Sequence, residues 1–186
     1  MRVPEEHRKS AAKQHFKFAI LTISTSKAEK ARHCDRHTLR ATEIAAEIGD
    51  VSGETAIKLL KSRGHDIVIY DVLPDDAEKI RASVMRALSS DADVIITTGG
   101  TGLARKDVTI ESVSDMIDKE ITGFGEIFRM KSYEKIGNAA ILSRSIAGVI
   151  NDKLIFCLPG SPDAVELAMN EIILDELPHI MRHVRE

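Results

Sequence analysis

The stretch DVIITTGGTGLARKDVT, Asp93 to Thr109, runs a β-rich apolar segment directly into a cluster of glycines and threonines, followed by a basic pair and a lone carboxylate. A simple turn needs one or two glycines, whereas Gly99, Gly100 and Gly102 are interleaved here with threonine. Glycine lets a ligand approach main-chain N–H groups, and threonine hydroxyls add donors for phosphate oxygens. The stretch therefore indicates a strand followed by a phosphate-binding loop.

The loop matches neither of the two best-known nucleotide motifs. It lacks the Gly-Lys-Ser/Thr ending of a P-loop, and it is not a dinucleotide GxGxxG. Taken alone, Gly-Gly-x-Gly also describes a mobile turn. Asp107 favours the functional interpretation, because a carboxylate just beyond an anion-binding loop is placed to hold the Mg²⁺ of a nucleotide. Its alternative role is to cap a helix near VTIES.

Strand-like and helix-patterned segments alternate along the chain. Helical spacing of apolar residues marks SGETAIKLLKSRGH and DDAEKIRASVMRALSSD. The short apolar runs that predict buried strands are Phe16 to Ser24, His65 to Leu73, Ala92 to Gly99 and Lys153 to Gly160. This alternation predicts a three-layer α/β/α fold, with a mostly parallel sheet covered by helices on both faces. Ligands of such folds bind beyond the carboxyl ends of the strands.

Length and composition limit the other possibilities. At 186 residues the chain suits one domain, which we assign to residues 16–186 after an N-terminal extension of residues 1–15. The net charge of −3 argues against a nucleic-acid partner. No apolar run approaches a membrane span and the charged start lacks a signal-peptide core, so we expect no membrane association and a cytoplasmic location. Cys157, inside an apolar run, is predicted to be a buried thiol.

Three further segments carry candidate site residues, and two of them follow predicted strands. Asp75 with Glu78 resembles a capping box, which by itself favours a helix cap. The turn from Pro159 to Pro162 delivers a helix N-terminus, which can face an anion or simply pack. Ser143 and Arg144 are suitable donors for a phosphate. Together these segments predict one phosphate-rich site that also contains carboxylates.

From about Phe16 to the C-terminus the sequence resembles the molybdenum cofactor biosynthesis proteins MoaB and MogA, which are related to the G domains of gephyrin and its plant counterpart. The likeness is closest to archaeal MoaB. The segments that carry it, in the family's order, are LTIS, SGETAIKLL, LPDD, TTGGTG, KDVT, ITGFGEIFR, LSRSIAG and LPGSPDAV. ITGFGEIFR, Ile121 to Arg129, is the most informative because it matches no generic requirement of the fold.

The resemblance implies a MogA/MoaB-like molybdopterin-binding fold and an adenylyl transfer. Family members bind Mg²⁺-ATP and molybdopterin as substrates and make adenylylated molybdopterin with release of pyrophosphate. The product then serves insertion of molybdate, or in some organisms tungstate, so transient contact with a MoeA-type insertion protein is expected. Family members form trimers, sometimes paired into hexamers, which implies a homotrimer or homohexamer here.

The resemblance also implies roles for individual residues. Asp75 and Asp107 match the two essential aspartates and are the predicted catalytic and Mg²⁺-binding residues, which replaces the cap interpretation of Asp75. The predicted nucleotide contacts are Thr98, Gly99, Gly100, Thr101, Gly102, Pro159, Gly160, Ser161 and Pro162. Thr22, Ser24 and Ser143 match contacts to the molybdopterin phosphate, and Asp50 and Ser52 match a further site segment. With the phosphate donor Arg144 these five form the predicted molybdopterin set.

Two features depart from the family pattern. Many relatives have aspartate directly after the serine of LTIS, where this chain has Thr25. The segment Lys27 to Gly49 is longer than in the bacterial versions, and is either a lid over the pterin or, as we favour, a surface insertion. Inside it, His33, Cys34 and His37 with nearby Asp35 have a spacing that suits zinc, but isolated His/Cys clusters are usually solvated and we assign no metal there.

Two alternatives to the adenylyltransferase stay open. One is a catalytically silent molybdopterin-binding or scaffold protein, which the presence of both Asp75 and Asp107 disfavours. The other is a CinA-like nucleotide enzyme, which GFGEIFR and LSRSIAG disfavour. If the loop glycines serve the ligand alone, Gly100→Val is expected to block nucleotide binding while leaving the sheet assembled.

Overall fold

The computed structural model describes residues 14–34 and 39–186. Within them the chain builds one six-stranded sheet in the order β2-β1-β3-β6-β5-β4. The first four strands in this order are parallel, β5 is antiparallel to β6, and β4 is antiparallel to β5. The strands are β1 (Lys17–Ile23), β2 (Asp66–Leu73), β3 (Val94–Thr98), β4 (Lys119–Glu120), β5 (Ile146–Ile150) and β6 (Lys153–Leu158).

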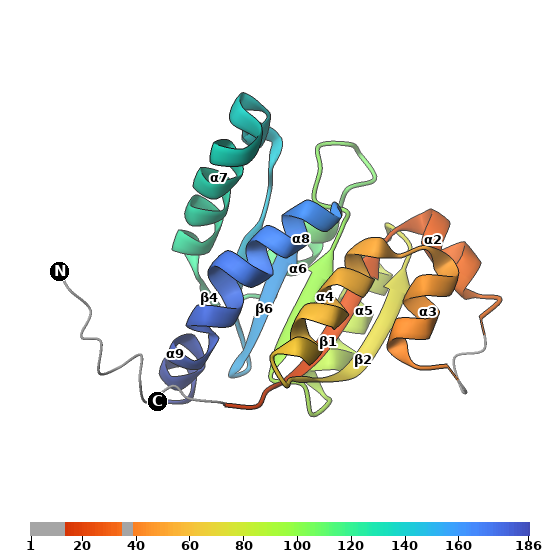
Figure 1. Ribbon diagram of the computed structural model, residues 1–186, viewed down its shortest axis with the longest axis horizontal. Helices are drawn as coiled ribbons and strands as arrows, with labels where there is room; N and C mark the ends of the chain where they lie inside the picture. Colours follow the sequence, from red (N-terminus) through yellow and green to blue (C-terminus); the bar gives the residue numbers. More distant parts are fainter. Residues whose placement is uncertain (1–13, 35–38) are drawn as a thin grey trace.

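Helices connect the strands and continue beyond the last of them (Figure 1). Those before β4 are α2 (Thr25–Ala31), α3 (Ala41–Ile48), α4 (Val51–Ser62), α5 (Ala77–Leu88) and α6 (Thr109–Ser114). Those after it are α7 (Thr122–Ile136), the 3₁₀ turn η1 (Gly137–Leu142), α8 (Pro162–Ala168), the π-helical turn η2 (Met169–Ile173) and α9 (Leu174–Arg185).

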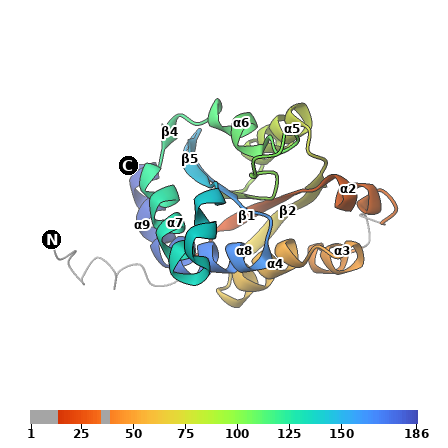
Figure 2. The same ribbon diagram turned by 90° about the horizontal axis from the view of Figure 1, so that it is seen from above.

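The alternation of side chains along the strands divides the core into two layers. Phe18 and Ile20 of β1 pack with residues of α4, α7, α8 and α9 on one face. Ala19 and Leu21 pack with residues of α5 and α6 on the other. Figure 2 shows α5 and α6 on one side of the sheet and α4, α7 and α8 on the opposite side. The predicted three-layer α/β/α fold with a mostly parallel sheet is confirmed.

The four predicted strands and two predicted helices are present, whereas β4 and β5 were missed. Ile146–Ile150 directly follows the predicted phosphate donors and returns as a hairpin with β6. Asn151 and Asp152 close this hairpin with φ of 48° and 60°, which these residues tolerate better than most. The C-terminal segment HIMRHVRE belongs to α9 up to Arg185, and its Met181 is buried in the core.

The described part of the segment from Lys27 to Gly49 forms α2 and α3. Ala28 and Ala31 of α2 pack with Ile44 and Ile48 of α3 against Val72 of β2, in a small apolar cluster. Both helices thus cover the edge of the sheet beside β2 (Figures 1 and 2). The insertion is therefore packed structure, and its first helix also contributes a side chain to the cavity described below.

The zinc hypothesis falls partly outside the described residues, since Asp35 and His37 are not among them. The buried Cys157 is confirmed: it is 0% exposed, and burial raises the pKa of its thiol to about 12. It therefore stays protonated and cannot act as a nucleophile near neutral pH. Among residues 14–34 and 39–186, no helix is both long and apolar enough to cross a membrane.

Candidate functional site

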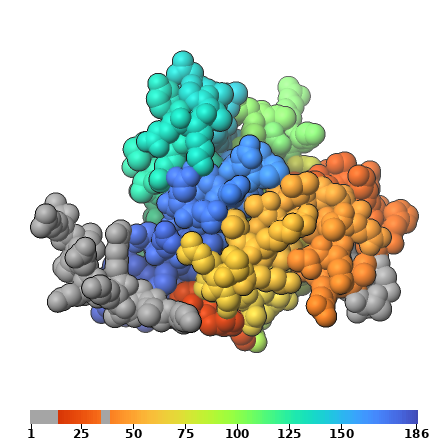
Figure 3. Space-filling view, in the orientation of Figure 1, coloured from red at the N-terminus to blue at the C-terminus, as the bar shows by residue number. Residues whose placement is uncertain are grey.

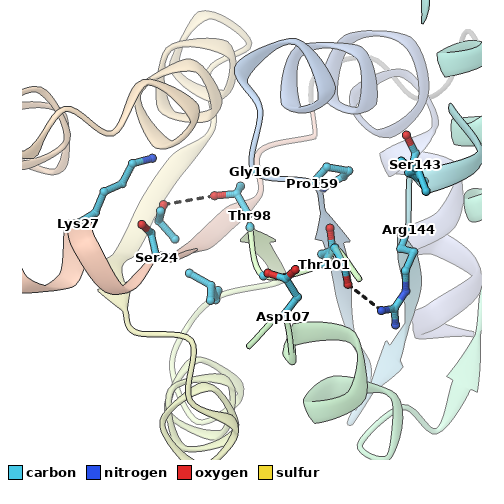
Figure 4. Close-up of a pocket in the computed structure, with 15 residues that line it drawn as sticks. Ser24, Lys27, Thr98, Thr101, Asp107, Ser143, Arg144, Pro159 and Gly160 are labelled. Carbon is cyan, nitrogen blue, oxygen red and sulfur yellow. Dashed lines mark hydrogen bonds between the residues drawn. The ribbon is translucent and has the colours of Figure 1, made fainter. Parts of the chain in front are cut away.

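A cavity of about 460 Å³ opens at the carboxyl edge of the parallel strands (Figure 4). The chain goes from β1 to β2 on one side of β1 and later enters β3 on its other side. The connections after β1 and after β3 therefore lead to helices on opposite faces of the sheet. Such a switch in strand order leaves a crevice for ligands. The cavity is lined by Thr22, Ile23, Ser24, Lys27, Thr98, Gly99, Gly100, Thr101, Gly102, Asp107, Leu142, Ser143, Arg144, Pro159 and Gly160.

Most of the predicted site residues therefore meet in one cavity. Strand order arranges them along the sheet edge: Thr22 lies near the end of β1 and Ser24 just after it, Thr98 ends β3, Pro159 follows β6, and Ser143 and Arg144 precede β5. Figure 4 shows Ser24 and Lys27 on one side of the β3 loop and Ser143 and Arg144 on the other. The predicted molybdopterin contacts thus lie at both ends of the cavity, with the predicted nucleotide loop between them.

The glycines of the loop are required by the protein's own packing. Gly99 has φ 95°, and a Cβ there would lie 2.4 Å from the carbonyl oxygen of Ile23. Gly100 has φ 63°, and its Cβ would lie 2.3 Å from the hydroxyl oxygen of Thr109. The expectation that Gly100→Val would spare the fold is therefore wrong, because the added atoms would meet β1 and α6 before any ligand.

α6 holds the loop from below while leaving its N–H groups free. The hydroxyl of Thr109 donates to the carbonyl of Gly99 at 2.9 Å, and the N–H of Thr109 donates to the carbonyl of Gly100 at 2.9 Å. Within the described residues, the N–H groups of Gly100, Thr101 and Gly102 donate to no partner. Consecutive free N–H groups of this kind form an anion-binding concavity.

Neither of the two predicted essential aspartates is the N-cap of the helix that follows it. The N-cap of α5 is Asp76, whose side chain accepts from the N–H of Lys79 at 3.1 Å. Asp75 instead accepts through Oδ2 from both the N–H and the hydroxyl of Thr25, at 3.0 and 2.8 Å. Thr25, the position at which the chain departs from the family pattern, thus holds one of the two aspartates.

Asp107 is also held by only one of its oxygens. Its Oδ2 accepts from the N–H of Ala104 at 2.9 Å, and α6 begins without a side-chain cap. In the described part of the chain, Oδ1 of Asp107 and Oδ1 of Asp75 accept no hydrogen bond. A Cβ at Gly102 would lie 2.6 Å from Asp107, and one at Gly100 would lie 3.4 Å from Oδ1 of Asp75. Both carboxylates therefore border the loop.

Asp50 lies behind the cavity wall rather than on it. It is 0% exposed and accepts from the hydroxyls of Thr22 and Tyr70 at 2.6 and 2.8 Å and from Nζ of Lys27 at 2.8 Å. Burial alone would raise the pKa of Asp50, but the hydrogen bonds from Lys27, Thr22 and Tyr70 and the charge of Lys27 outweigh it and lower the pKa. Asp50 therefore stays ionised.

Three other predicted residues support the site without lining it. The hydroxyl of Ser52 donates to the carbonyl of Gly160 at 2.7 Å and so fixes the turn after β6. The hydroxyl of Ser161 accepts from the N–H of Ala164 at 3.3 Å and caps α8, and Pro162 is the first residue of that helix. These contacts give Ser52, Ser161 and Pro162 structural roles, and their contacts with a ligand stay a prediction.

Part of the hydrogen-bonding capacity of Arg144 is used within the protein. Its guanidinium donates to the carbonyl of Gly102 at 2.9 Å and to the carboxylate of Glu111, which it also pairs with electrostatically. Burial would raise the pKa of Glu111, but the contact with Arg144 lowers it. Arg144 thus ties the segment before β5 to the glycine loop, and Ser143 remains beside it on the cavity wall.

Sequence reasoning missed Ile23, Lys27 and Leu142 as lining residues, and Thr25 as the partner of Asp75. Ile23 and Leu142 are apolar and carry no chemical signal. Lys27 begins the insertion, where a lysine is ordinarily a solvated surface residue. Its pairing with Asp50, 23 positions away, is invisible without the fold.

Comparison with known proteins places these residues in context. The family described as "Probable molybdopterin binding domain" matches residues 19–179. The chain is 45% identical to molybdenum cofactor biosynthesis protein B of Bacillus cereus over 177 residues, which cover 94% of each protein. It is 41% identical to a Pyrococcus furiosus protein named molybdopterin adenylyltransferase over 186 residues, which cover 98% of each.

A solved structure agrees with these sequence similarities. The crystal structure of the tungsten cofactor synthesizing protein MoaB from Pyrococcus furiosus superposes with a TM-score of 0.76 at 39% identity, covering 94% of this chain and 100% of that one. The likeness therefore covers nearly the whole chain.

Proposed function

Because the chain belongs to the MoaB family of molybdenum cofactor biosynthesis proteins, whose domain binds molybdopterin, we propose that it transfers the adenylyl group of Mg²⁺-ATP to the terminal phosphate of molybdopterin. In this reaction a phosphate oxygen of molybdopterin attacks the α-phosphorus of ATP. The new P–O bond forms as the bond to the departing pyrophosphate breaks. The MoaB assignment agrees with the family resemblance carried by the eight sequence segments.

The free N–H groups of Gly100, Thr101 and Gly102 are the observation that carries this proposal. They border a cavity whose neighbouring carboxylates are Asp75 and Asp107. N–H donors alone suit any anion, and carboxylates alone would repel one. The combination suits a polyphosphate that arrives with a divalent cation.

The carboxylate pair fits Mg²⁺. This ion prefers oxygen ligands and is commonly held in proteins by one or two carboxylates together with substrate phosphates. Asp75 and Asp107 would hold it, each with an oxygen that accepts no hydrogen bond in the described residues. Bound there, Mg²⁺ would supply positive charge against the negative charge of the phosphates.

The chain's own residues perform positioning and charge stabilisation. The loop N–H groups orient the nucleotide phosphates, and Thr109 keeps the loop in its ligand-ready shape. Joining two anions requires alignment of their oxygens and compensation of their charge. No nucleophilic side chain is needed, which agrees with the inert state of Cys157.

The two ends of the cavity then take different parts of molybdopterin. β1 and β5 are three strand spacings apart in the sheet, roughly 14 Å, so Ser24 and Ser143 would not share one phosphate. The acceptor phosphate must lie close to the nucleotide phosphates, and β1 is the direct neighbour of β3. We therefore assign the phosphate to the Thr22–Ser24 end and the remainder of the substrate to the Ser143 end.

The test of the function is direct. Incubation of the protein with molybdopterin, Mg²⁺ and ATP is expected to release pyrophosphate and to yield AMP attached to the pterin, detected by mass spectrometry. Omission of molybdopterin should suppress pyrophosphate release. Binding of molybdopterin without formation of the AMP adduct would indicate a binding protein or scaffold. Pyrophosphate release that does not depend on molybdopterin would indicate another nucleotide chemistry.

Ser143→Ala is expected to weaken molybdopterin binding about two- to tenfold without changing the free energy of unfolding. One hydrogen bond to an uncharged part of the ligand is worth roughly 0.5 to 1.5 kcal/mol. The hydroxyl of Ser143 makes no hydrogen bond within the described residues, so its loss costs the fold nothing. Equilibrium dialysis with molybdopterin measures the effect. Unchanged affinity would remove Ser143 from the site.

The trimer or hexamer expected from the family resemblance has a matching surface. Six exposed apolar side chains of α7 and η1 form a surface that we call the α7 face: Ile127, Met130, Tyr133, Ile136, Ile141 and Leu142. They are six of the ten large apolar side chains exposed in the described part of the chain. Figure 3 shows α7 projecting from the body of the molecule. Apolar patches of this kind mark interfaces.

We assign a second copy of the chain to the α7 face. Glu126, Arg129 and Glu134 lie on the same helix and form no ion pair within the described residues. Because each copy presents both signs, Arg129 of one copy can pair with a glutamate of the next copy around the ring. Leu142 also lines the cavity, so this interface would adjoin the site.

Met130→Glu is expected to reduce the molar mass measured by light scattering at micromolar concentration, because it places a charge in the interface. Met85→Glu on α5 is the matched control, since Met85 and Met130 are similarly exposed, at 51% and 57%. The control should keep the parent mass. A monomeric parent protein would contradict the assembly, and equal masses for all three would remove the α7 face from it.

A further inference from the structure

Lys27 provides a cation at the β1 end of the cavity. It lies on α2, the first helix of the insertion, and lines the cavity beside Thr22 and Ser24. Its side chain is 25% exposed, and Nζ lies 2.8 Å from Oδ1 of Asp50. Figure 4 shows the Lys27 side chain above Ser24 at this end. No segment that carries the family resemblance contains this residue.

The network behind Lys27 determines which donors remain for a ligand. The single hydroxyl proton of Thr22 is donated to Asp50 at 2.6 Å, and the Thr22 oxygen accepts from the hydroxyl of Thr98 at 3.4 Å. Thr22 therefore has no proton to donate to a phosphate. Asp50 is fully buried and faces Thr22, Tyr70 and Lys27. Neither Thr22 nor Asp50 can bind an anion directly.

Lys27 retains donors that the network does not use. An ammonium group has three N–H donors, and the contact with Asp50 uses one of them. Ser24, on the same wall, shares its hydroxyl only with Ser26 at 3.3 Å among the described residues. The other cation on the cavity wall, Arg144, lies at the opposite end and is paired with Glu111. Lys27 and Ser24 are thus the donors at the β1 end.

We propose that Lys27 binds the terminal phosphate of the acceptor substrate, together with the hydroxyl of Ser24, and that Asp50 is the positioning residue that aims the ammonium group. The identification of the acceptor as molybdopterin rests on the proposed function. The ligand chemistry, a phosphate monoester dianion, rests on Lys27 and Ser24 themselves. A lysine that only neutralised Asp50 would need no place on the cavity wall.

Four variants separate binding from structural support. Lys27→Met removes the cation but also leaves the buried Asp50 charge unpaired, so its midpoint of urea unfolding should fall. Lys27→Met with Asp50→Asn removes both charges and should recover most of that loss. Asp50→Asn alone keeps the cation but removes the negative charge that positions it. Lys30→Met, on the exposed side of the same helix, is the matched control.

Across the four variants, the affinity for molybdopterin should not change in parallel with the midpoint of urea unfolding. Both variants that lack Lys27 are expected to bind it at least tenfold more weakly, Asp50→Asn should lose less, and Lys30→Met should bind as the parent does. A titration with inorganic phosphate followed by ³¹P NMR should show the same order, and it applies even if the parent fails to bind molybdopterin and the proposed function falls. Parental affinity for phosphate in the double variant, or a loss in Asp50→Asn as large as in Lys27→Met, would overturn the assignment of Lys27.

Discussion

Asp107→Asn and Asp75→Asn are each expected to fold normally and to slow pyrophosphate release by on the order of a hundredfold or more, the scale of losing about 2.7 kcal/mol of transition-state stabilisation. An amide keeps the shape of the carboxylate but removes its charge and is a poorer Mg²⁺ ligand. Neither aspartate is the N-cap of the helix that follows it, and an asparagine oxygen can still accept the hydrogen bonds from Thr25 or Ala104, so little stability depends on the charge. Molybdopterin, whose phosphate meets other donors, should still bind.

The neighbouring Asp76 is the matched control. It caps α5 through a hydrogen bond from the N–H of Lys79, and asparagine is as good an N-cap as aspartate. Asp76→Asn should therefore keep both stability and activity. Rates close to that of the parent in Asp75→Asn or Asp107→Asn would remove that residue from the mechanism, and such rates in both would remove the carboxylate-assisted mechanism itself.

Gly99→Ala is expected to lower the free energy of unfolding by roughly 2 to 5 kcal/mol and to abolish adenylyl transfer. The left-handed backbone costs a non-glycine residue about 1 to 2 kcal/mol, and overpacking costs roughly 1 to 3 kcal/mol more. The overpacking arises because the Cβ would lie 2.4 Å from the carbonyl oxygen of Ile23. The loop would have to move away from β1, which displaces its N–H donors. Urea unfolding and the pyrophosphate assay measure the two losses.

Gly64→Ala separates the two contributions. Gly64 has φ 81°, close to the 95° of Gly99, but an added Cβ would meet nothing within 4 Å. It should therefore show the backbone cost of about 1 to 2 kcal/mol alone and keep full activity. If both glycine variants lost the same stability, the crowding against Ile23 would be relieved by small shifts, and Gly99 would be a turn former only.

Local sequence signals were sufficient for most of the fold. Four apolar runs predicted β1, β2, β3 and β6, because buried parallel strands are short and continuously apolar. β5 was missed because its residues, Ile146–Ile150, follow directly on a segment interpreted as a phosphate-binding loop. β4 has only two residues, Lys119 and Glu120, and both are exposed, so it carries no apolar pattern.

The sequence predicted which segments lie at the site better than it predicted which of their side chains face the cavity. Strand ends bring Ser24, Thr98, Pro159 and Ser143 to one cavity, as expected for residues that follow parallel strands. Asp50 and Ser52, predicted as ligand contacts, lie behind the wall instead. A motif identifies residues near a site, but whether a side chain faces the ligand or a neighbour depends on packing from other elements.

By itself, then, the sequence determined the α/β class and the glycine loop, because apolar periodicity and glycine clusters are short-range patterns. The family resemblance, not a local pattern, added Asp75 to Asp107 as the second predicted catalytic residue. Tertiary structure alone decided that Thr25 holds Asp75 from 50 positions away, and that Lys27 pairs with Asp50. It also decided that Gly99 must be glycine because β1 crowds it. These contacts join segments that only the folded sheet brings together, and no local pattern encodes such a distance.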